Sequence, residues 1–211
     1  MIAGTSLIQR VVERAKLARR ANAIFVATDD KRIADHVAAF GGKVVQPQGD
    51  FHSGTDRIAA SLDLLGEEFD AVINVQGDEP LIDAASIDAV AEALSGADMA
   101  TLACPIESEE ERQSPHIVKV VTALDGTALY FSRAPLAGAR RHIGLYGYRT
   151  RVLRALAKLE PSPLERAESL EQLRALQNGF KIQVLHTRTP HLGIDRPEDV
   201  LRVEQELAKH G

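Results

Sequence analysis

The sequence is poor in several residues that would point to a particular class of protein. Its 211 residues include one cysteine, Cys104, and no tryptophan. A single cysteine excludes an internal disulfide and any metal site built from several cysteines, and it is typical of a reducing cytoplasm. The apolar neighbours Leu102 and Ala103 predict a core position for Cys104 and not the role of a nucleophile.

Long apolar runs and continuous positive charge are missing as well. No stretch approaches the ~20 apolar residues of a membrane helix, and the first residues lack the basic-then-apolar layout of a secretory signal. The net charge is −5, with basic residues scattered among acidic ones, which predicts no cationic face for nucleic acid. We therefore expect a soluble cytoplasmic protein that binds neither nucleic acid nor membrane.

Short apolar runs alternate with helical patterns along the chain. Residues 23–27 predict a buried strand, residues 31–40 a helix that stops at Gly41-Gly42, and residues 44–45 a second strand. This βαβ order predicts an α/β protein with a mostly parallel sheet. The length suits a single domain over residues 1–211.

A different pattern occupies the middle of the chain. Residues 117–122 and 127–131 flank Asp125-Gly126 and predict a β-hairpin, and residues 141–148 predict a third strand. We expect these three to form a small antiparallel addition at about 116–149, beside the parallel sheet.

One long helix is expected near the carboxyl end. Pro161-Ser162-Pro163 begins it and Asn178-Gly179 ends it. On such a helix Glu168, Glu171 and Gln172 are spaced i, i+3 and i+4, so they share one face.

The segment 72–80 is the first candidate for chemistry. An apolar run of strand length ends in Gly77, Asp78, Glu79 and Pro80, as a buried strand does when it delivers polar groups to the ligand-binding edge of a sheet. Asp78 is therefore a candidate for binding a metal or a phosphate. The alternative is that Asp78 and Glu79 merely open the helix that follows.

A second candidate precedes the helix that starts near Thr55. Ser53, Gly54 and Thr55 are small enough to bring backbone N–H groups and a helix N-terminus against an anion or a base edge, and Arg57 lies in the first turn. The same residues also suit a simple capping loop.

These segments carry a family resemblance. Asn-Val-Gln-Gly-Asp-Glu-Pro at 74–80, with His-Ser-Gly-Thr-Asp-Arg at 52–57, resembles the 3-deoxy-manno-octulosonate cytidylyltransferases, or CMP-Kdo synthetases. Further matches follow in the family's order, at residues 128–133, 141–149, 161–165, 170–174 and 193–199. The resemblance implies a Rossmann-like, GT-A-type nucleotidyltransferase fold of three layers.

The resemblance also implies an activity and its residues. Family members transfer the cytidylyl group of CTP to the anomeric hydroxyl of Kdo (3-deoxy-D-manno-octulosonate), release pyrophosphate, use Mg²⁺ and serve lipopolysaccharide synthesis; a homodimer is expected. By this resemblance the catalytic Mg²⁺ ligands are Asp78 and Asp195, the nucleotide contacts are Ser53, Gly54, Arg57 and Gln76, and the sugar contacts are Arg133, His142, Tyr146, Glu171 and Gln172.

Three of these residues have plainer interpretations. Asp195 suits a helix N-cap shortly before Pro197. His142 suits a structural histidine, and Tyr146 a core aromatic residue with a bonded hydroxyl. Either a protein group or metal-lowered acidity of the Kdo hydroxyl can serve the deprotonation step.

The sequence departs from the family at two places. The usual opening strand and phosphate-binding loop have no match ahead of Met1, and residues 134–141 are shorter than usual, where a flap near Kdo or part of a dimer contact is expected. Two other functions therefore stay open. One is a cytidylyltransferase for another acidic sugar, such as an aminated Kdo or a sialic acid, and the other is a truncated, non-catalytic sugar-binding relative.

Overall fold

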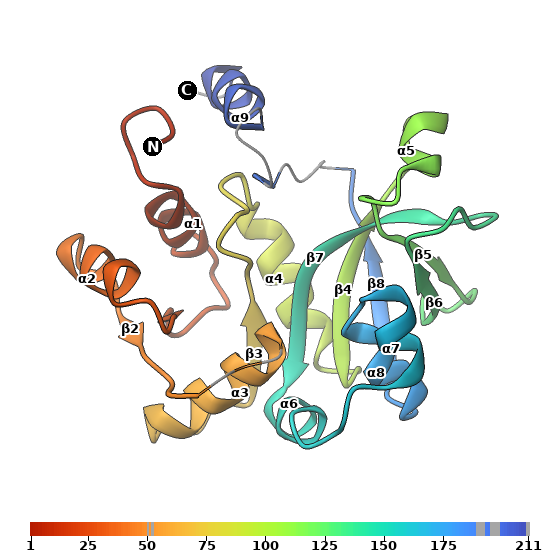
Figure 1. Cartoon of the computed structure of the whole chain (residues 1–211), viewed down its shortest axis with the longest axis horizontal. Coiled ribbons are helices and arrows are strands. Elements are labelled where there is room, and N and C mark those ends of the chain that lie inside the picture. The colour runs from red at the N-terminus through yellow and green to blue at the C-terminus, as the bar shows by residue number, and fades with distance from the viewer. Residues whose placement is uncertain (50, 52, 189–192, 195–198, 210–211) are drawn as a thin grey trace.

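The computed structural model describes residues 1–49, 51, 53–188, 193–194 and 199–209. Figure 1 shows the elements in chain order. The helices are α1 (Leu7–Ala15), α2 (Lys31–Ala39), α3 (Gly54–Leu65), α4 (Ala84–Ala93), α5 (Glu109–Gln113), α6 (Thr150–Leu156), α7 (Pro163–Glu168), α8 (Gln172–Gln177) and α9 (Asp199–Lys209). The strands are β1 (Val26–Ala27), β2 (Val44–Val45), β3 (Ala71–Asn74), β4 (Met99–Cys104), β5 (Lys119–Thr122), β6 (Ala128–Ser132), β7 (Arg140–Arg149) and β8 (Ile182–His186). Within the described ranges, no helix has the length and apolarity to cross a membrane.

The predicted βαβ unit at the start of the chain is confirmed. β1 and β2 pair in parallel, with Val26 opposite Val44, and α2 connects them. Asp30 begins α2 because its carboxylate accepts a hydrogen bond from the N–H of Arg32 at 2.7 Å. The helix ends at Ala39, and two residues later Gly41 has a φ of +77°, which favours glycine. The two strands form a small sheet of their own.

The main sheet corrects the prediction of a mostly parallel sheet. Its order is β6-β5-β7-β4-β8, and β3 also pairs with β7. β7 is antiparallel to β3, β4 and β5, and β4 with β8 is the parallel pair described within this sheet. The sheet is therefore mixed and largely antiparallel.

β7 is the middle strand of this sheet and not part of an addition at its edge (Figure 1). Both of its faces are buried, with Ile143 and Leu145 on one side and Tyr146 and Tyr148 on the other. A strand that is apolar on both faces is stable only where helices cover both sides. The predicted β5–β6 hairpin is confirmed, with Val120 opposite Phe131.

Helices cover the two faces of the main sheet and make three layers. On one face, α1 and α4 supply Ala15, Ile87 and Val90 to the core. On the other face, α3, α6 and α8 supply apolar side chains that include Leu62, Leu153 and Leu173. This α/β arrangement confirms the predicted fold class at the level of layers; the single domain over residues 1–211 stays a prediction.

The single helix predicted over residues 163–178 is wrong. A capping box between Ser162 and Glu165 begins α7, but Ser169 has a φ of +54° and ends it. The chain then turns and begins α8. Glu168 and Glu171 therefore lie on different elements and face different partners, which a regular helix would not allow.

Candidate active site

The N-terminus of α3 is capped from within the chain. The hydroxyl of Ser53 accepts a hydrogen bond from the N–H of Asp56 at 3.1 Å, so Ser53 has the capping role that was one of the two interpretations of this segment. The N–H groups of Gly54 and Thr55 point to the carboxylate of Glu171, at 3.3 and 3.4 Å. A carboxylate at this position stabilises the positive end of the helix dipole.

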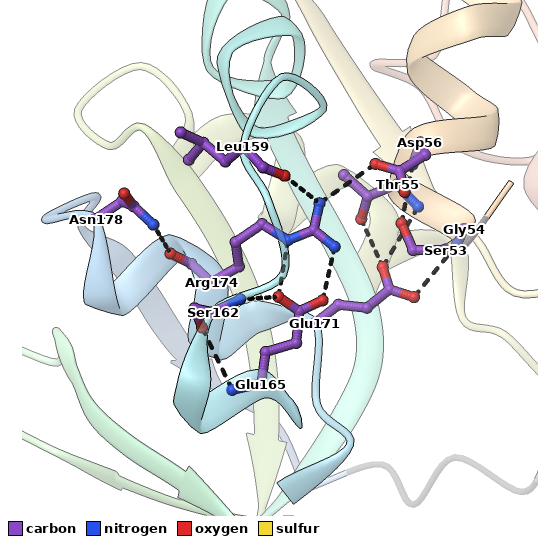
Figure 2. A network of polar contacts seen from close by, with 10 residues as sticks. All are labelled: Ser53, Gly54, Thr55, Asp56, Leu159, Ser162, Glu165, Glu171, Arg174 and Asn178. Carbon is purple, nitrogen blue, oxygen red and sulfur yellow. Dashed lines mark hydrogen bonds and ion pairs between the residues drawn. The ribbon is translucent and has the colours of Figure 1, made fainter. Parts of the chain in front are cut away.

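Glu171 connects two sets of residues that the sequence analysis kept apart. It directly precedes α8 and was expected to contact the sugar, whereas Gly54 was expected to contact the nucleotide. The hydroxyl of Thr55 also donates to Glu171, at 2.8 Å. Figure 2 shows the Glu171 carboxylate reaching across to the first turn of α3. The two candidate sets therefore meet at this contact.

Three of the predicted nucleotide residues share a cavity of about 510 Å³. Gly54, Arg57 and Gln76 line it together with residues of β1, β2 and β3. The Nε of Arg57 is buried and has no hydrogen-bond partner within the described ranges, and a carboxylate oxygen of Asp29 lies 3.9 Å from its guanidinium. A buried donor without an acceptor is unfavourable, so an anion bound here gains a ready partner.

The turn after β3 carries the candidate metal ligand Asp78. This residue is half-buried, and its backbone carbonyl accepts a hydrogen bond from the N–H of Ile194 at 2.9 Å. Gly193 packs on the same turn, where an added Cβ would lie 3.5 Å from the carboxylate of Glu79. Residues 193–194 therefore lie against the Asp78 turn, and Asp195, the other predicted ligand, lies outside the described residues.

The donor set fits Mg²⁺ only as a site shared with substrate. Among the residues that the structure describes, no three His, Cys, Asp or Glu side chains gather to hold a metal ion. Mg²⁺ is commonly bound through one or two carboxylates, with water and substrate phosphates completing its octahedron. Asp78, in the turn after β3 and near the cavity that Arg57 lines, fits this kind of site.

A row of rings follows β7 away from the α3 contact. The rings of His142 and Tyr146 lie 5.2 Å apart, and those of Tyr146 and Tyr148 stack at 6.0 Å. Burial lowers the pKa of His142 to about 3 and raises the pKa of Tyr146 well above its ordinary value. At neutral pH both side chains are therefore uncharged hydrogen-bonding groups.

Thr101 fixes the tautomer of His142. Its hydroxyl lies 2.9 Å from the carbonyl of Leu145 and 3.0 Å from Nε2 of His142. The hydroxyl has one proton and faces two carbonyl acceptors, those of Ile143 and Leu145, so we expect Nε2 of His142 to donate to Thr101. The acceptor nitrogen Nδ1 is then left for another partner. Sequence reasoning did not single out Thr101.

Arg133 is held by an acidic residue that the sequence analysis gave no role. The backbone N–H of Arg133 donates to the carboxylate of Glu168 at 2.9 Å, and its Nε donates to the Glu168 carbonyl at 3.2 Å. The hydroxyl of Ser132 also donates to Glu168, at 2.7 Å. Hydrogen bonds from Arg133 and Ser132 outweigh the effect of burial and keep the pKa of Glu168 below its ordinary value. Glu168 therefore stays charged and fixes the end of β6.

Gln172 lies in the wall between the two candidate sets. It is the first residue of α8, is 8% exposed, and lines a narrow space with Thr55, Tyr148 and Glu171. Arg133 is different, because its side chain donates to the backbone carbonyls of Glu168 and Pro115. The structure thus brings Gly54, Glu171 and Gln172 close together. Arg133 follows β6, whose Phe131 packs against the ring of His142.

A buried ion-pair network supports this region (Figure 2). The guanidinium of Arg174, 4% exposed, forms two hydrogen bonds to Glu165, at 2.8 and 2.6 Å. It also contacts the carboxylate of Asp56 and the carbonyl of Leu159, at 3.4 and 3.3 Å. Arg174 thereby ties α7 and α8 to the first turn of α3.

Sequence reasoning had the members of this network in view but assigned them no role. Glu165 and Arg174 stand in two of the matched segments, and the spacing of Ser162 and Glu165 is a signal for a capping box. Burial alone would raise the pKa of Glu165, but the hydrogen bonds from Arg174 and from the Ser162 N–H lower it below its ordinary value. A short sequence motif does not show that Arg174 is buried and charged beside two carboxylates, so its role could not be predicted.

Comparison with known proteins agrees with the resemblance seen in the sequence. The family model described as "Cytidylyltransferase" matches residues 1–182. The chain is 46% identical to a 3-deoxy-manno-octulosonate cytidylyltransferase of Syntrophotalea carbinolica, over 98% of this chain and 90% of the relative. It is 44% identical to the enzyme of the same name from Myxococcus xanthus, over 100% of this chain and 89% of the relative.

Solved structures give the same picture. CMP:2-keto-3-deoxy-manno-octonic acid synthetase complexed with CTP superimposes with a TM-score of 0.92 and 35% identity, covering 100% of this chain and 91% of the other. 4-diphosphocytidyl-2C-methyl-D-erythritol synthase from Anaerococcus prevotii shares the fold, with a TM-score of 0.69 and 14% identity over 99% of this chain and 91% of the other. The chain belongs to the 3-deoxy-manno-octulosonate cytidylyltransferase family.

Proposed function

We propose that this chain transfers the CMP group of CTP to the anomeric hydroxyl of Kdo and releases pyrophosphate, for lipopolysaccharide synthesis. One observation carries the proposal for this chain's own residues. Arg57, a half-buried cation whose buried Nε has no hydrogen-bond partner within the described ranges, shares a cavity with Gln76, and Asp78 follows Gln76 by two residues. An anion site and a carboxylate at the end of one strand suit a nucleoside triphosphate.

The reaction needs positioning more than covalent help. The oxygen of the anomeric hydroxyl attacks the α-phosphorus of CTP, a new P–O bond forms, and the bond to the β-phosphate oxygen breaks. The hydroxyl loses its proton, and pyrophosphate leaves with the electron pair. Charge spreads over the phosphate oxygens during this step, so fixed positive charge on the protein lowers the barrier.

The nucleotide is held by the α3 side of the cavity. The Glu171 carboxylate already accepts hydrogen bonds from the N–H groups of Gly54 and Thr55 at the N-terminus of α3. We therefore assign the phosphates to the Arg57 guanidinium and not to this helix N-terminus. Gln76 can donate and accept hydrogen bonds, which suits the edge of cytosine. Ser53 holds the turn by its cap, and Gly54 presents no side chain to the cavity.

Asp78 and Asp195 would hold Mg²⁺. When bound, this ion gathers the phosphates and neutralises their developing charge. Asp78 is supplied by the turn after β3, next to residues 193–194, and Asp195 follows these two residues in the sequence. Two carboxylates from distant parts of the chain would then share one ion.

Kdo is assigned to the row of rings on β7 and to the segment around Glu171. Its carboxylate suits Arg133, which spends two of its five N–H donors on backbone carbonyls. Its hydroxyls suit neutral partners: Nδ1 of His142 as an acceptor, the protonated hydroxyl of Tyr146, and the amide of Gln172. Glu171 adds a carboxylate acceptor between sugar and nucleotide.

The remaining expectations follow from the same assignment. We propose that the chain works in the cytoplasm, where CTP is available, and that it forms a homodimer. Its partners are then the two small substrates and a second copy of itself.

Pyrophosphate release tests the proposal. The chain should release pyrophosphate from CTP only when both Kdo and Mg²⁺ are present, and Asp78→Asn, which keeps size but removes charge, should abolish the release. Release that continues without Kdo would identify a nucleotide hydrolase. Equal rates with a sialic acid in place of Kdo would overturn the assignment of the sugar.

A further inference from the structure

Lys119 is a buried cation without a role in the proposed mechanism. It is the first residue of β5 and is 0% exposed. Its Nζ donates hydrogen bonds to the backbone carbonyls of Ser114 and Arg133, the latter at 2.8 Å. Both partners are neutral carbonyls, and neither offsets the charge of the ammonium group. Because a lysine is rarely buried completely unless it is paired, its position calls for an explanation.

The position of β5 explains which segments Lys119 can reach. β5 lies between β6 and β7 in the main sheet, and Lys119 stands opposite Ser132 of β6 (Figure 1). Arg133 directly follows Ser132, so the end of β6 is within reach of the Lys119 side chain. Ser114 belongs to the turn between α5 and β5, where its carbonyl also accepts the N–H of Ile117 at 3.3 Å. Lys119 therefore ties this turn to the end of β6.

The two segments that Lys119 connects also hold Arg133. Nη1 of Arg133 donates to the carbonyl of Pro115 in the same turn, at 3.2 Å. Its backbone N–H donates to the Glu168 carboxylate at 2.9 Å, and its Nε donates to the Glu168 carbonyl at 3.2 Å. An anion thus holds the N–H of Arg133, and the Lys119 cation holds its carbonyl. Two of the five guanidinium donors are used, and the half-buried side chain has the others for a ligand.

The two cations also influence each other. Burial and the nearby guanidinium of Arg133 lower the pKa of Lys119 below its ordinary value. An anion bound by Arg133 relieves this repulsion, because its negative charge attracts both cations. The pair therefore favours a negatively charged ligand over a neutral ligand of the same shape.

We propose that Lys119 is a positioning residue for the sugar: it holds the backbone of Arg133 and the turn at Ser114 and Pro115, so that the guanidinium binds the sugar's carboxylate. This inference rests on the proposed function, which supplies the contact between Arg133 and Kdo. Lys119 has no exposed surface and does not touch the sugar, so it acts through Arg133. Without the Lys119 ammonium both carbonyls lose their donor, and the guanidinium is no longer fixed.

A double-mutant cycle tests whether Lys119 acts through Arg133. Lys119→Met keeps the length of the side chain but removes its donors and its charge. Pyrophosphate release is measured for wild type, Lys119→Met, Arg133→Ala and the double variant, with Kdo and CTP varied in turn. Lys158→Met, at an exposed position after α6, is the matched control and should leave all kinetic constants unchanged.

Lys119→Met should raise KM for Kdo by about tenfold or more, whereas kcat and KM for CTP should stay within about threefold of wild type. In the Arg133→Ala background, the same change should raise KM for Kdo by less than about twofold. A merely structural role would lower the active fraction, and so kcat, and would leave KM unchanged. An unchanged KM for Kdo, or an equal rise with and without Arg133, would overturn the proposal.

A second measurement uses the wild-type chain and decides if Lys119→Met does not fold. The chain is labelled with ¹³C at the Cε atoms of lysine, and Lys119 is titrated by NMR in the presence of CTP, with Mg²⁺ withheld so that no product forms. Saturating Kdo should raise the pKa of Lys119, because the sugar's carboxylate offsets the charge of Arg133. The neutral amide of Kdo should not raise it. An unchanged pKa with Kdo, or an equal rise with the amide, would overturn the proposal.

The failure of this inference differs from the failure of the proposed function. A wild-type chain that releases no pyrophosphate with Kdo would overturn the proposed function, and the assignment of Arg133 to the sugar with it. A wild-type chain that depends on Kdo, combined with additive effects of Lys119→Met and Arg133→Ala, would leave the function standing and overturn only the role of Lys119.

Discussion

β3 and β4 have similarly apolar sequences but very different burial. All six residues of β4 are buried. None of the four residues of β3 is buried, although Ala71, Val72 and Ile73 are apolar. β4 has β7 on one edge and β8 on the other, whereas β3 has only β7 in the described sheet. The difference shows that apolar sequence marks a strand, but its neighbours on both edges determine whether it becomes core.

The contrast extends to the elements around each strand. We call β4, β7, β8 and α6 to α8 the closed half, and α1 to α3 with β1 to β3 the open half. Two polar side chains reach from the closed half to the first turn of α3: Glu171, directly before α8, contacts Thr55, and Arg174 of α8 contacts Asp56. These contacts connect the closed half to the open half at the candidate site.

Breaking the buried contact across the boundary should have the largest effect. Arg174→Ala leaves Glu165 charged and buried, so we expect a loss of about 3–5 kcal/mol in the free energy of unfolding, measured in urea. Arg154 of α6 forms an exposed ion pair with Asp63 of α3, which also crosses the boundary. Arg154→Ala should lower the free energy of unfolding by less than about 1 kcal/mol. Equal losses would mean that Arg174 is not the tie between the halves.

Shortening an apolar side chain should cost more stability in the closed half than in the open half. Leu153 is fully buried in the closed half, and Leu153→Ala should cost about 2–5 kcal/mol in the same urea titration. Val72 in β3 is half-buried, and Val72→Ala should cost about 1 kcal/mol because part of its surface already meets water. A loss at Val72 as large as that at Leu153 would show that the open half is packed like the closed one.

Lowering the pH should destabilise the closed half, because His142 is buried there in its neutral form. Its folded pKa is about 3 and its ordinary pKa is 6.5, so the unfolded chain binds a proton first as the pH falls. The stability contributed by neutral His142 is complete above pH 6.5 and is lost between 6.5 and about 3, by at most about 1.4 kcal/mol per pH unit.

The comparison that measures this effect is between wild type and His142→Gln, unfolded in urea at several pH values. The variant should show a flatter decline between pH 6.5 and 4. His36→Gln, at an exposed position of the open half, is the control and should keep the wild-type decline. Parallel curves for wild type and His142→Gln would contradict a buried neutral histidine.

The smallest effect is expected at the exposed contact across the boundary. Glu171→Gln keeps an acceptor but removes the charge from the N-terminus of α3, so the free energy of unfolding should fall by about 0.3–1 kcal/mol. Glu68→Gln, also exposed but in the loop between α3 and β3, should leave stability unchanged. A rise in stability for Glu171→Gln would show that its carboxylate repels more than it caps.

Local features of the fold were predictable, because they depend on neighbours in the sequence. The apolar run at β3, the βαβ unit of β1 and β2 and the hairpin of β5 and β6 contain strands as expected. The pairing of β7 was not predictable: nothing within residues 141–148 says that this strand enters between β3 and β4. The break at Ser169 was missed because neither glycine nor proline marks it.

The candidate site divides in the same way. Gly54, Arg57 and Gln76 share one cavity, but their roles, like those of the sugar residues, stay predictions. Arg174 was missed because its partners, Glu165 and Asp56, lie 9 and 118 residues away in the sequence. The expected absence of an opening strand and loop stays a prediction too.

The fate of the α-phosphorus of CTP is the most direct test of the central claim. The folded chain is incubated with CTP, Kdo and Mg²⁺ and followed by phosphorus NMR. We predict that the triphosphate signals give way to one new phosphodiester signal and to pyrophosphate in equal amounts, and that Kdo is required. Free CMP without a phosphodiester, or no conversion by the folded chain, would contradict cytidylyl transfer to Kdo.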